Sequence, residues 1–311
     1  MLERLVGNDA LKQDLTRALQ AGRLPHAVLF VGEPGCGSGF AARCLAADYL
    51  YPQGGAHAEA VLRGEDSECL ALRGSGASGL FKVSEVRDAR TRIQSSALST
   101  DARGRVMLLY GAQNMNSESA NALLKIIEEP PEGVLFVFTA TSAATVLPTI
   151  RSRCAAYTLT PVPAAECADA LCRACPNLRR PEADRLAFLY EGHLGLCLRA
   201  AQEKKTAALL QTASDLLAQV ARQDSYRTLH ALYPYERDRE GFLALLWQLC
   251  QLCSAVLRDP AFGTDLNGLK PALAAHTLQV AEETRCAVNT NANLRLTTAV
   301  FAAKLCSAPM Q

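Results

Sequence analysis

Residues 27–39 read AVLFVGEPGCGSG, and this stretch decides the fold. Its first part, Ala27 to Gly32, is a continuous apolar run of strand length that ends in glycine. An alanine-rich stretch, FAARCLAADYL at 40–50, follows with the composition of a helix. Strand, glycine loop and helix in this order are the architecture of an α/β unit that binds phosphate. The sequence therefore predicts a phosphate loop near the start of the chain.

Two more buried strands are predicted downstream, each after an amphipathic helix. The apolar runs at 106–110 and 134–140 follow the helical patterns at 83–97 and 117–129. Strands that are nearly all apolar, alternating with helices, indicate a parallel sheet covered on both faces. We therefore expect a doubly wound α/β domain.

The rest of the chain predicts helices only. Strand signals stop near Leu159, and apolar residues then recur at three- and four-residue steps to the C-terminus. We expect three parts: an α/β domain over 1–160, a small helical lid over 161–205, and an all-helical collar over 206–311. The Gly- and Ser-rich segment 52–79 reads as an irregular insertion.

Composition excludes several classes of protein. Lys and Arg number 32 against 31 Asp and Glu, so the net charge of +1 would not carry the molecule onto nucleic acid or an anionic membrane. We see no signal peptide and no uninterrupted apolar run of about 18 residues. Of the 12 cysteines, five lie in apolar helical patterns: Cys44, Cys172, Cys250, Cys253 and Cys306. These features predict a reduced cytoplasmic protein with no membrane partner, whose thiols serve as small hydrophobic groups.

The predicted phosphate loop departs from a working one. A P-loop has the form G-x-x-x-x-G-K-[ST], in which lysine contacts the outer phosphates and the hydroxyl holds Mg²⁺. Gly32 and Gly37 occupy the glycine positions, with Gly35 between them. Ser38 stands at the lysine position and Gly39 at the hydroxyl position.

The acidic groups are missing as well. Tyr110 and Gly111 end the second buried run, where a metal-binding acidic pair is expected. Without lysine, hydroxyl and acid, the γ-phosphate has no counter-charge, so we predict no ATP hydrolysis by this chain. Two readings of the loop stay open. The backbone could hold nucleotide weakly, or the loop could bind nothing.

Two motifs further along resemble those of the bacterial clamp-loader subunits, an AAA+ family. They are NALLKIIEEPP at 121–131 and TIRSRC at 149–154. The opening GRLPHAVLFVGEPG at 22–35 and the tail NTNANLRLTTAVF at 289–301 extend the likeness over most of the chain. Within the family, the chain is most similar to the subunit type whose own ATP site is degraded and whose SRC motif is kept.

The resemblance implies a P-loop NTPase-like AAA+ fold and a role for Ser152, Arg153 and Cys154. The family uses the arginine of this motif as a finger that reaches the ATP site of the neighbouring subunit. The structural alternative is that Arg151 and Arg153 only form a solvated turn. The resemblance also implies partners: the tau/gamma ATPase subunits, the delta subunit, the sliding clamp, and primer–template DNA within the ring. The rival functions are an independently active ATPase of the tau/gamma type and a stand-alone DNA-binding module.

Other family positions are less distinctive. Leu123, Leu124 and Ile127 read as core, while Glu128 and Glu129 either stop a helix or face an adjoining subunit. Thr141 occupies the place of the family's first sensor, and Gly195 stands where motor subunits carry a second-sensor arginine.

The family's zinc module is not expected here. Its segment at 52–79 holds Cys69 alone, and a four-sulfur site cannot be assembled locally. The pairs Cys172/Cys175 and Cys250/Cys253 have ligand-like spacing, but the second pair lies in an apolar helical run. We therefore expect neither a metal nor a tightly bound cofactor.

Overall fold

The structure, a computed structural model, describes residues 1–75, 79–94, 99, 101–290 and 292–307. The chain divides into two compact units. The first comprises Met1–Ala170 and Glu191–Leu196, and the second Leu171–Tyr190 and Cys197–Gln311. The boundary runs through the segment expected as a lid, so the three-part division stays a prediction.

The first unit is built on a five-stranded parallel sheet with strand order β2-β3-β4-β1-β5. The strands are β1 (Ala27–Val31), β2 (Cys69–Arg73), β3 (Arg105–Tyr110), β4 (Val134–Ala140) and β5 (Ala155–Thr158). Its helices are α1 (Asp9–Gln20), α2 (Ser38–Leu50), α3 (Ala56–Arg63), α4 (Val83–Ile93), α5 (Ser117–Glu128) and α6 (Pro148–Arg151). Short 3₁₀ turns cover Leu2–Arg4, Ala112–Asn114 and Ala143–Thr145. The expected parallel α/β fold is therefore present.

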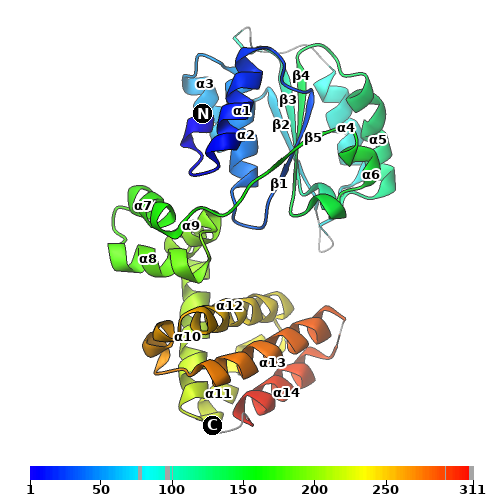
Figure 1. The fold of residues 1–311 in the computed structure, drawn as a ribbon. Helices are drawn as coiled ribbons and strands as arrows, with labels where there is room; N and C mark the ends of the chain where they lie inside the picture. Colours follow the sequence, from blue (N-terminus) through cyan, green and yellow to red (C-terminus); the bar gives the residue numbers. More distant parts are fainter. Residues whose placement is uncertain (76–78, 95–98, 100, 291, 308–311) are drawn as a thin grey trace. The chain divides into compact units, whose positions relative to one another are not determined.

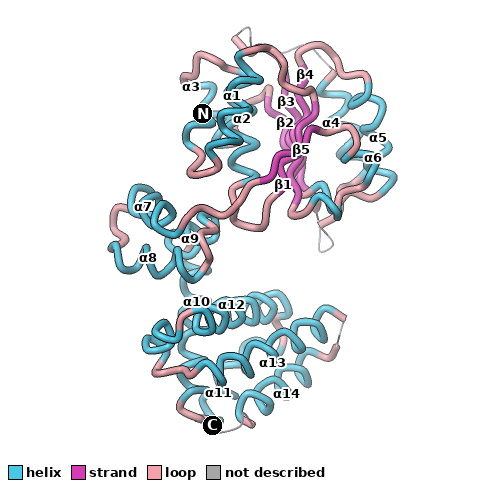
Figure 2. The backbone as a smooth tube through the Cα atoms, viewed as in Figure 1, coloured by secondary structure: helices cyan, strands magenta, loops and turns pink. Residues whose placement is uncertain are grey.

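Helices cover both faces of this sheet, as Figures 1 and 2 show, with α1 to α3 on one face and α4 to α6 on the other. Successive strand residues alternate between two cores because side chains alternate across a strand. Val28 and Phe30 belong to the core beneath α2, whereas Leu29 belongs to the core beneath α5. Burial on both faces explains why the central strands read as continuous apolar runs.

The expectation of an irregular insertion over 52–79 is wrong for much of that segment. It contains helix α3 and strand β2, and β2 pairs with β3 from Cys69↔Val106 to Arg73↔Tyr110. The buried carboxylate of Glu68, just before β2, accepts a hydrogen bond from Arg105 Nε at 2.8 Å. The segment is therefore an edge of the sheet, anchored by a buried ion pair.

The remaining helices follow, and no strand lies among the residues that the structure describes after β5. They are α7 (Ala164–Ala174), α8 (Arg180–Leu189), α9 (Leu194–Gln202), α10 (Lys204–Ala221), α11 (Ser225–Leu232), α12 (Arg239–Arg258), α13 (Pro271–Asn289) and α14 (Leu294–Cys306). Short 3₁₀ segments cover Tyr233–Glu236 and Pro260–Leu266. Figure 1 traces α10 to α14 in yellow-green to red.

Helix α12 is the core helix of the second unit. Phe242, Leu245, Leu249 and Val256 along it are fully buried. By length and composition alone it could cross a membrane, but just over half of its most apolar window is buried inside the protein. Its apolar character is accounted for by packing against α10 and α13.

Candidate functional site

The phosphate loop connects β1 to α2 at the carboxyl end of the sheet. Gly32 N donates to Ala140 O at 3.0 Å, which ties the start of the loop to the end of β4. Gly35 and Gly37 have φ of +98° and +92°, a left-handed region that side chains with a Cβ rarely adopt. Ser38 and Gly39 then open α2. The structure thus brings the five predicted loop residues together at one helix N-terminus.

An aromatic ring lies where the acidic group of a metal site would stand. Tyr110 ends β3, and its Cε1 atom would be 3.3 Å from a Cβ placed on Gly39. The guanidinium of Arg73, from the end of β2, lies 4.1 Å from the centre of the Tyr110 ring. This cation–π pair fills the space beside the first turn of α2. The sequence indicates that the acid is missing, but not that its place is occupied.

A second segment closes over the loop from the start of α9. Gly195 N donates to Gly35 O at 2.9 Å, and a Cβ on Gly35 would lie 2.6 Å from Leu196 Cγ. His193 Nε2 lies 3.1 Å from Glu33 Oε2. A Cβ on Gly195 would lie 3.1 Å from Gly35 O, so the absence of a side chain permits this close backbone contact. Gly195, which the resemblance places at the second-sensor position, therefore packs against the loop.

Arg153 lies at the opposite end of the sheet from the phosphate loop. It follows α6 and comes just before β5, which runs parallel to β1 with Val28 opposite Ala155 and Val31 opposite Thr158. Parallel strands start at the same end of the sheet, so Arg153 lies at the amino ends of the strands and the phosphate loop at their carboxyl ends. A four-residue strand at about 3.3 Å per residue separates them by on the order of 10 Å or more. Arg153 is therefore not part of a site with this chain's own loop.

The Arg153 guanidinium has partners within its own chain. Nε donates to Glu128 Oε1 at 2.8 Å, and Nη2 donates to the same oxygen. Nη1 donates to Thr149 O at 2.8 Å and to Ser152 Oγ at 3.3 Å. The side chains of Arg153 and Glu128 remain 33% and 47% exposed. No sequence signal predicted this ion pair, because 25 residues separate its members.

The other members of the SRC motif have distinct surroundings. Ser152 is exposed, whereas Cys154 packs against the core beneath α5. Burial raises the pKa of the Cys154 thiol to about 12. The thiol therefore stays protonated near neutral pH and is not an activated nucleophile.

Helix α5 combines core and surface residues. Leu123 and Ile127 are fully buried, which confirms their reading as core, whereas Leu124 is only partly buried and packs against that core. Asn121 and Lys125 are exposed. Glu128 is the last helical residue and Glu129 caps the end, so the helix does stop there as one reading predicted.

The sensor position Thr141 is exposed directly after β4. The nearby Thr139 is buried instead and accepts a hydrogen bond from Gly111 N at 3.1 Å through its hydroxyl. Thr139 thus joins β4 to the turn after β3.

Metal-binding geometry is not found in the described ranges. All 12 cysteines are free, and these ranges hold no group of three or more His, Cys, Asp or Glu side chains placed to bind one ion. Burial raises the pKa of Cys250 to about 12, which opposes the thiolate form that zinc requires. The expected lack of a metal stays a prediction.

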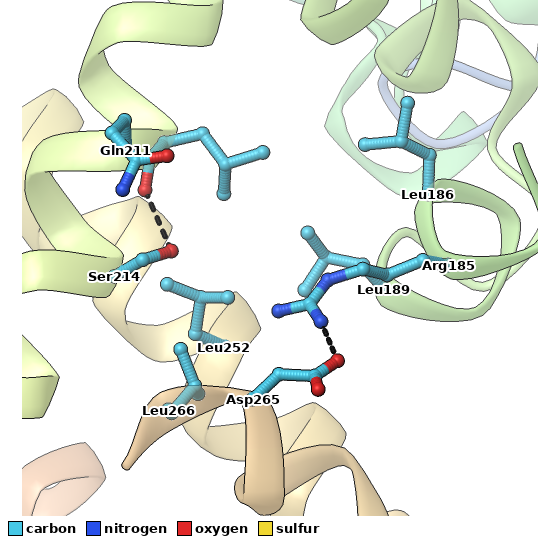
Figure 3. Close-up of a pocket in the computed structure, with 9 residues that line it drawn as sticks. Arg185, Leu186, Leu189, Gln211, Ser214, Leu252, Asp265 and Leu266 are labelled. Atoms are coloured by element: carbon cyan, nitrogen blue, oxygen red, sulfur yellow. Dashed lines mark hydrogen bonds and ion pairs between the residues drawn. The ribbon is translucent and has the colours of Figure 1, made fainter. Parts of the chain in front are cut away.

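A pocket of about 250 Å³ lies in the second unit, among α8, α10, α12 and the turn at 260–266 (Figure 3). Arg185 and Asp265 point toward each other across it and form an ion pair. The Arg185 guanidinium also lies 4.6 Å from the centre of the Phe262 ring. The two charged groups that line this pocket therefore pair with each other.

The fold and the glycine loop define a P-loop protein of the AAA+ class. A gamma subunit-related DNA polymerase III protein from Thermotoga maritima shares this fold, with a TM-score of 0.54 at 15% identity over 94% of this chain and 99% of that one. Residues 7–163 match the model of the family described as DNA polymerase III, delta subunit. The chain therefore belongs to that family, which confirms its likeness to bacterial clamp-loader subunits.

Individual relatives agree with this assignment. The DNA polymerase III subunit gamma/tau of Mycobacterium tuberculosis is 36% identical over 180 residues, covering 55% of this chain and 30% of the relative. The tau subunit of Escherichia coli is 33% identical over 165 residues, covering 50% of this chain and 25% of the relative. A replication factor C small subunit of Methanococcus maripaludis is 25% identical over 78% of this chain and 71% of its own length. The chain thus spans less than a third of the gamma/tau relatives.

Proposed function

We propose that this chain is a delta-prime type subunit of the DNA polymerase III clamp loader. It does not hydrolyse ATP itself. It acts as a stator in a ring of subunits and supplies Arg153 to the ATP site of an adjacent tau/gamma subunit. With the delta subunit, the ring opens the sliding clamp and places it on primer–template DNA in the cytoplasm.

The position of Arg153 carries this proposal. The residue lies at the amino ends of the strands, whereas the chain's own phosphate loop lies at their carboxyl ends, and the Arg153 side chain is 33% exposed. A guanidinium in that position can reach a phosphate only on another molecule. Charge supplied in trans by an arginine finger stabilises the γ-phosphoryl group as it leaves. The solvated-turn alternative does not account for the same motif in a chain of this family.

The chain's own loop supports the other half of the proposal. Ser38 and Gly39 replace the lysine and the hydroxyl, and Tyr110 occupies the acidic position. The backbone of Gly195 and the side chain of Leu196 lie against Gly35. Groups that neutralise the γ-phosphate are missing, and the space near the loop is partly filled.

The rival function, an independently active ATPase, is favoured by the identity to gamma/tau subunits. Phosphate release by the purified chain separates the two. We expect no turnover above background. Turnover near one per second that is lost on changing an acidic residue of this chain would contradict the proposal.

Arg153→Ala tests the finger within a loader reconstituted from its subunits. The site served by Arg153 should lose about 10³-fold or more of its DNA- and clamp-stimulated ATP hydrolysis, since a finger contributes at least that much. Assembly should persist, because the side chain is partly exposed. Arg151→Ala is the matched control: Arg151 is exposed and its Nη1 donates to Ala143 O at 3.2 Å in the same segment. An unchanged ATPase with Arg153→Ala, or a failure to assemble, would show the finger assignment to be wrong.

A further inference from the structure

The contacts of Arg153 point to a restraint on the finger. Arginine has five N–H donors, and four hydrogen bonds to Glu128, Thr149 and Ser152 already engage the group. The Nε–Nη2 edge, which would bind two phosphate oxygens in parallel, is turned to the Glu128 carboxylate. In the free chain the guanidinium is therefore held by hydrogen bonds to its own chain.

We propose that Glu128 is a positioning residue that holds Arg153 in the hydrogen-bonded position described above, the parked pose, until a neighbouring subunit presents a phosphate. This rests on the proposed function, in which Arg153 acts in trans. On engagement, the Arg153–Glu128 ion pair breaks and an Arg153–phosphate pair forms. The Glu128 carboxylate then returns to water. One anion replaces another, so the guanidinium keeps a negatively charged partner in both states.

The exposure of the pair makes this exchange feasible. Glu128 is 47% exposed, so water can solvate its carboxylate as soon as the guanidinium leaves. Exposed ion pairs are weak, and breaking one changes an equilibrium by only about two- to fivefold. A nucleotide phosphate in a water-poor site can compete with so weak a partner. Glu128 therefore sets a modest threshold for engagement.

The anchoring of both elements supports a defined parked pose. Glu128 is the last residue of α5, whose Ile127 is fully buried, and Arg153 follows α6, whose Ile150 is buried at 1% exposure. Both elements pack on the same core. Thr149 O fixes the Nη1 side of the guanidinium, so removal of Glu128 should release only the Nε–Nη2 edge.

Glu128→Gln tests the proposal directly in the isolated chain. The neutral amide keeps the shape but loses the charge-assisted bond, so reaction of Arg153 with phenylglyoxal should rise about two- to fivefold, measured by mass spectrometry of the peptide that contains it. Glu129→Gln removes the adjacent exposed carboxylate and should leave labelling unchanged. Equal labelling in all three proteins would overturn the parking role, whatever the function of Arg153.

The assembled loader provides the second readout. With Glu128→Gln, half-maximal ATPase stimulation should require about two- to fivefold less of this subunit than with wild type, and Glu129→Gln should match wild type. A loss of stimulation like that of Arg153→Ala would instead make Glu128 necessary for engagement and overturn the proposal. If Arg153→Ala itself has no effect, the proposed function fails, and the labelling experiment shows separately whether the ion pair restrains Arg153.

Discussion

The tightness of the contact between the phosphate loop and the start of α9 can be tested by the unfolding free energy of Gly35→Ala. Two costs add at this position. Gly35 has φ +98°, where a Cβ costs about 1–2 kcal/mol. The new Cβ would also lie 2.6 Å from Leu196 Cγ, and forcing an extra carbon into a packed site costs about 1–3 kcal/mol. The smaller entropy of the unfolded alanine chain returns about 0.4–1 kcal/mol. The first unit should lose about 1–5 kcal/mol of unfolding free energy.

Gly22→Ala is the control for the backbone term alone. Gly22 has φ +64°, and a Cβ there meets nothing within 4 Å. Its cost should be about 0–1.5 kcal/mol, from the same two backbone terms. The difference between the variants, about 1–3 kcal/mol, is therefore the cost of the contacts made by the new Cβ, of which the one with Leu196 Cγ at 2.6 Å is the tightest. His193 Cβ at 3.1 Å and Leu196 N at 3.2 Å are the other two. Gly35→Ala/Leu196→Ala removes the contact with Leu196 Cγ, and the double-mutant cycle should return a coupling of up to that size.

Urea unfolding read by amide hydrogen exchange is the appropriate assay. Trp247, the one tryptophan of the sequence, lies in the second unit and cannot report on the first. Mass spectrometry of peptides from β1 and α2 assigns the free energy to the correct unit. If Gly35→Ala costs no more than Gly22→Ala, Leu196 does not press on the loop and the closure argument fails.

Three further predictions concern the loop and the SRC motif. Ser38→Lys/Gly39→Thr should not yield ATP turnover in a phosphate-release assay, because the Cβ at 39 meets the Tyr110 ring and no acidic metal ligand is restored; measurable turnover would refute this. Cys154, with a pKa of about 12, should resist iodoacetamide at pH 8 while exposed Cys306 reacts, which peptide mass spectrometry can check. The Cys154 thiol ionises near pH 9 in the unfolded chain but only at higher pH in the folded chain. The unfolding free energy should therefore fall as pH rises above about 9. A Cys154→Ala variant should lack that part of the fall.

The central part of the fold was predictable because its strands are buried on both faces. The strands β1, β3 and β4 read as unbroken apolar runs, and each lies where the sequence places it. The edge strands β2 and β5 were missed. Only the first two residues of β2 are buried, β5 alternates between half-buried and exposed residues, and each strand is four or five residues long. So short a mixed pattern does not differ from a loop in the sequence.

The candidate site was predictable residue by residue but not in its contacts. Motif spacing located the loop glycines, and the resemblance to clamp-loader subunits pointed to Arg153. The pairing of Arg153 with Glu128, and of Gly195 with Gly35, depends on how distant segments meet in three dimensions. The missing acid at Tyr110 is visible in the sequence, whereas the stacking of Arg73 on its ring requires the register of β2 on β3.

The filled space around the loop also limits which side chains the loop and its neighbours accept. A side chain added at Gly39 meets the ring of Tyr110, and one added at Gly195 meets the backbone of Gly35. A larger residue at either position therefore requires a compensating shift or substitution in its neighbour.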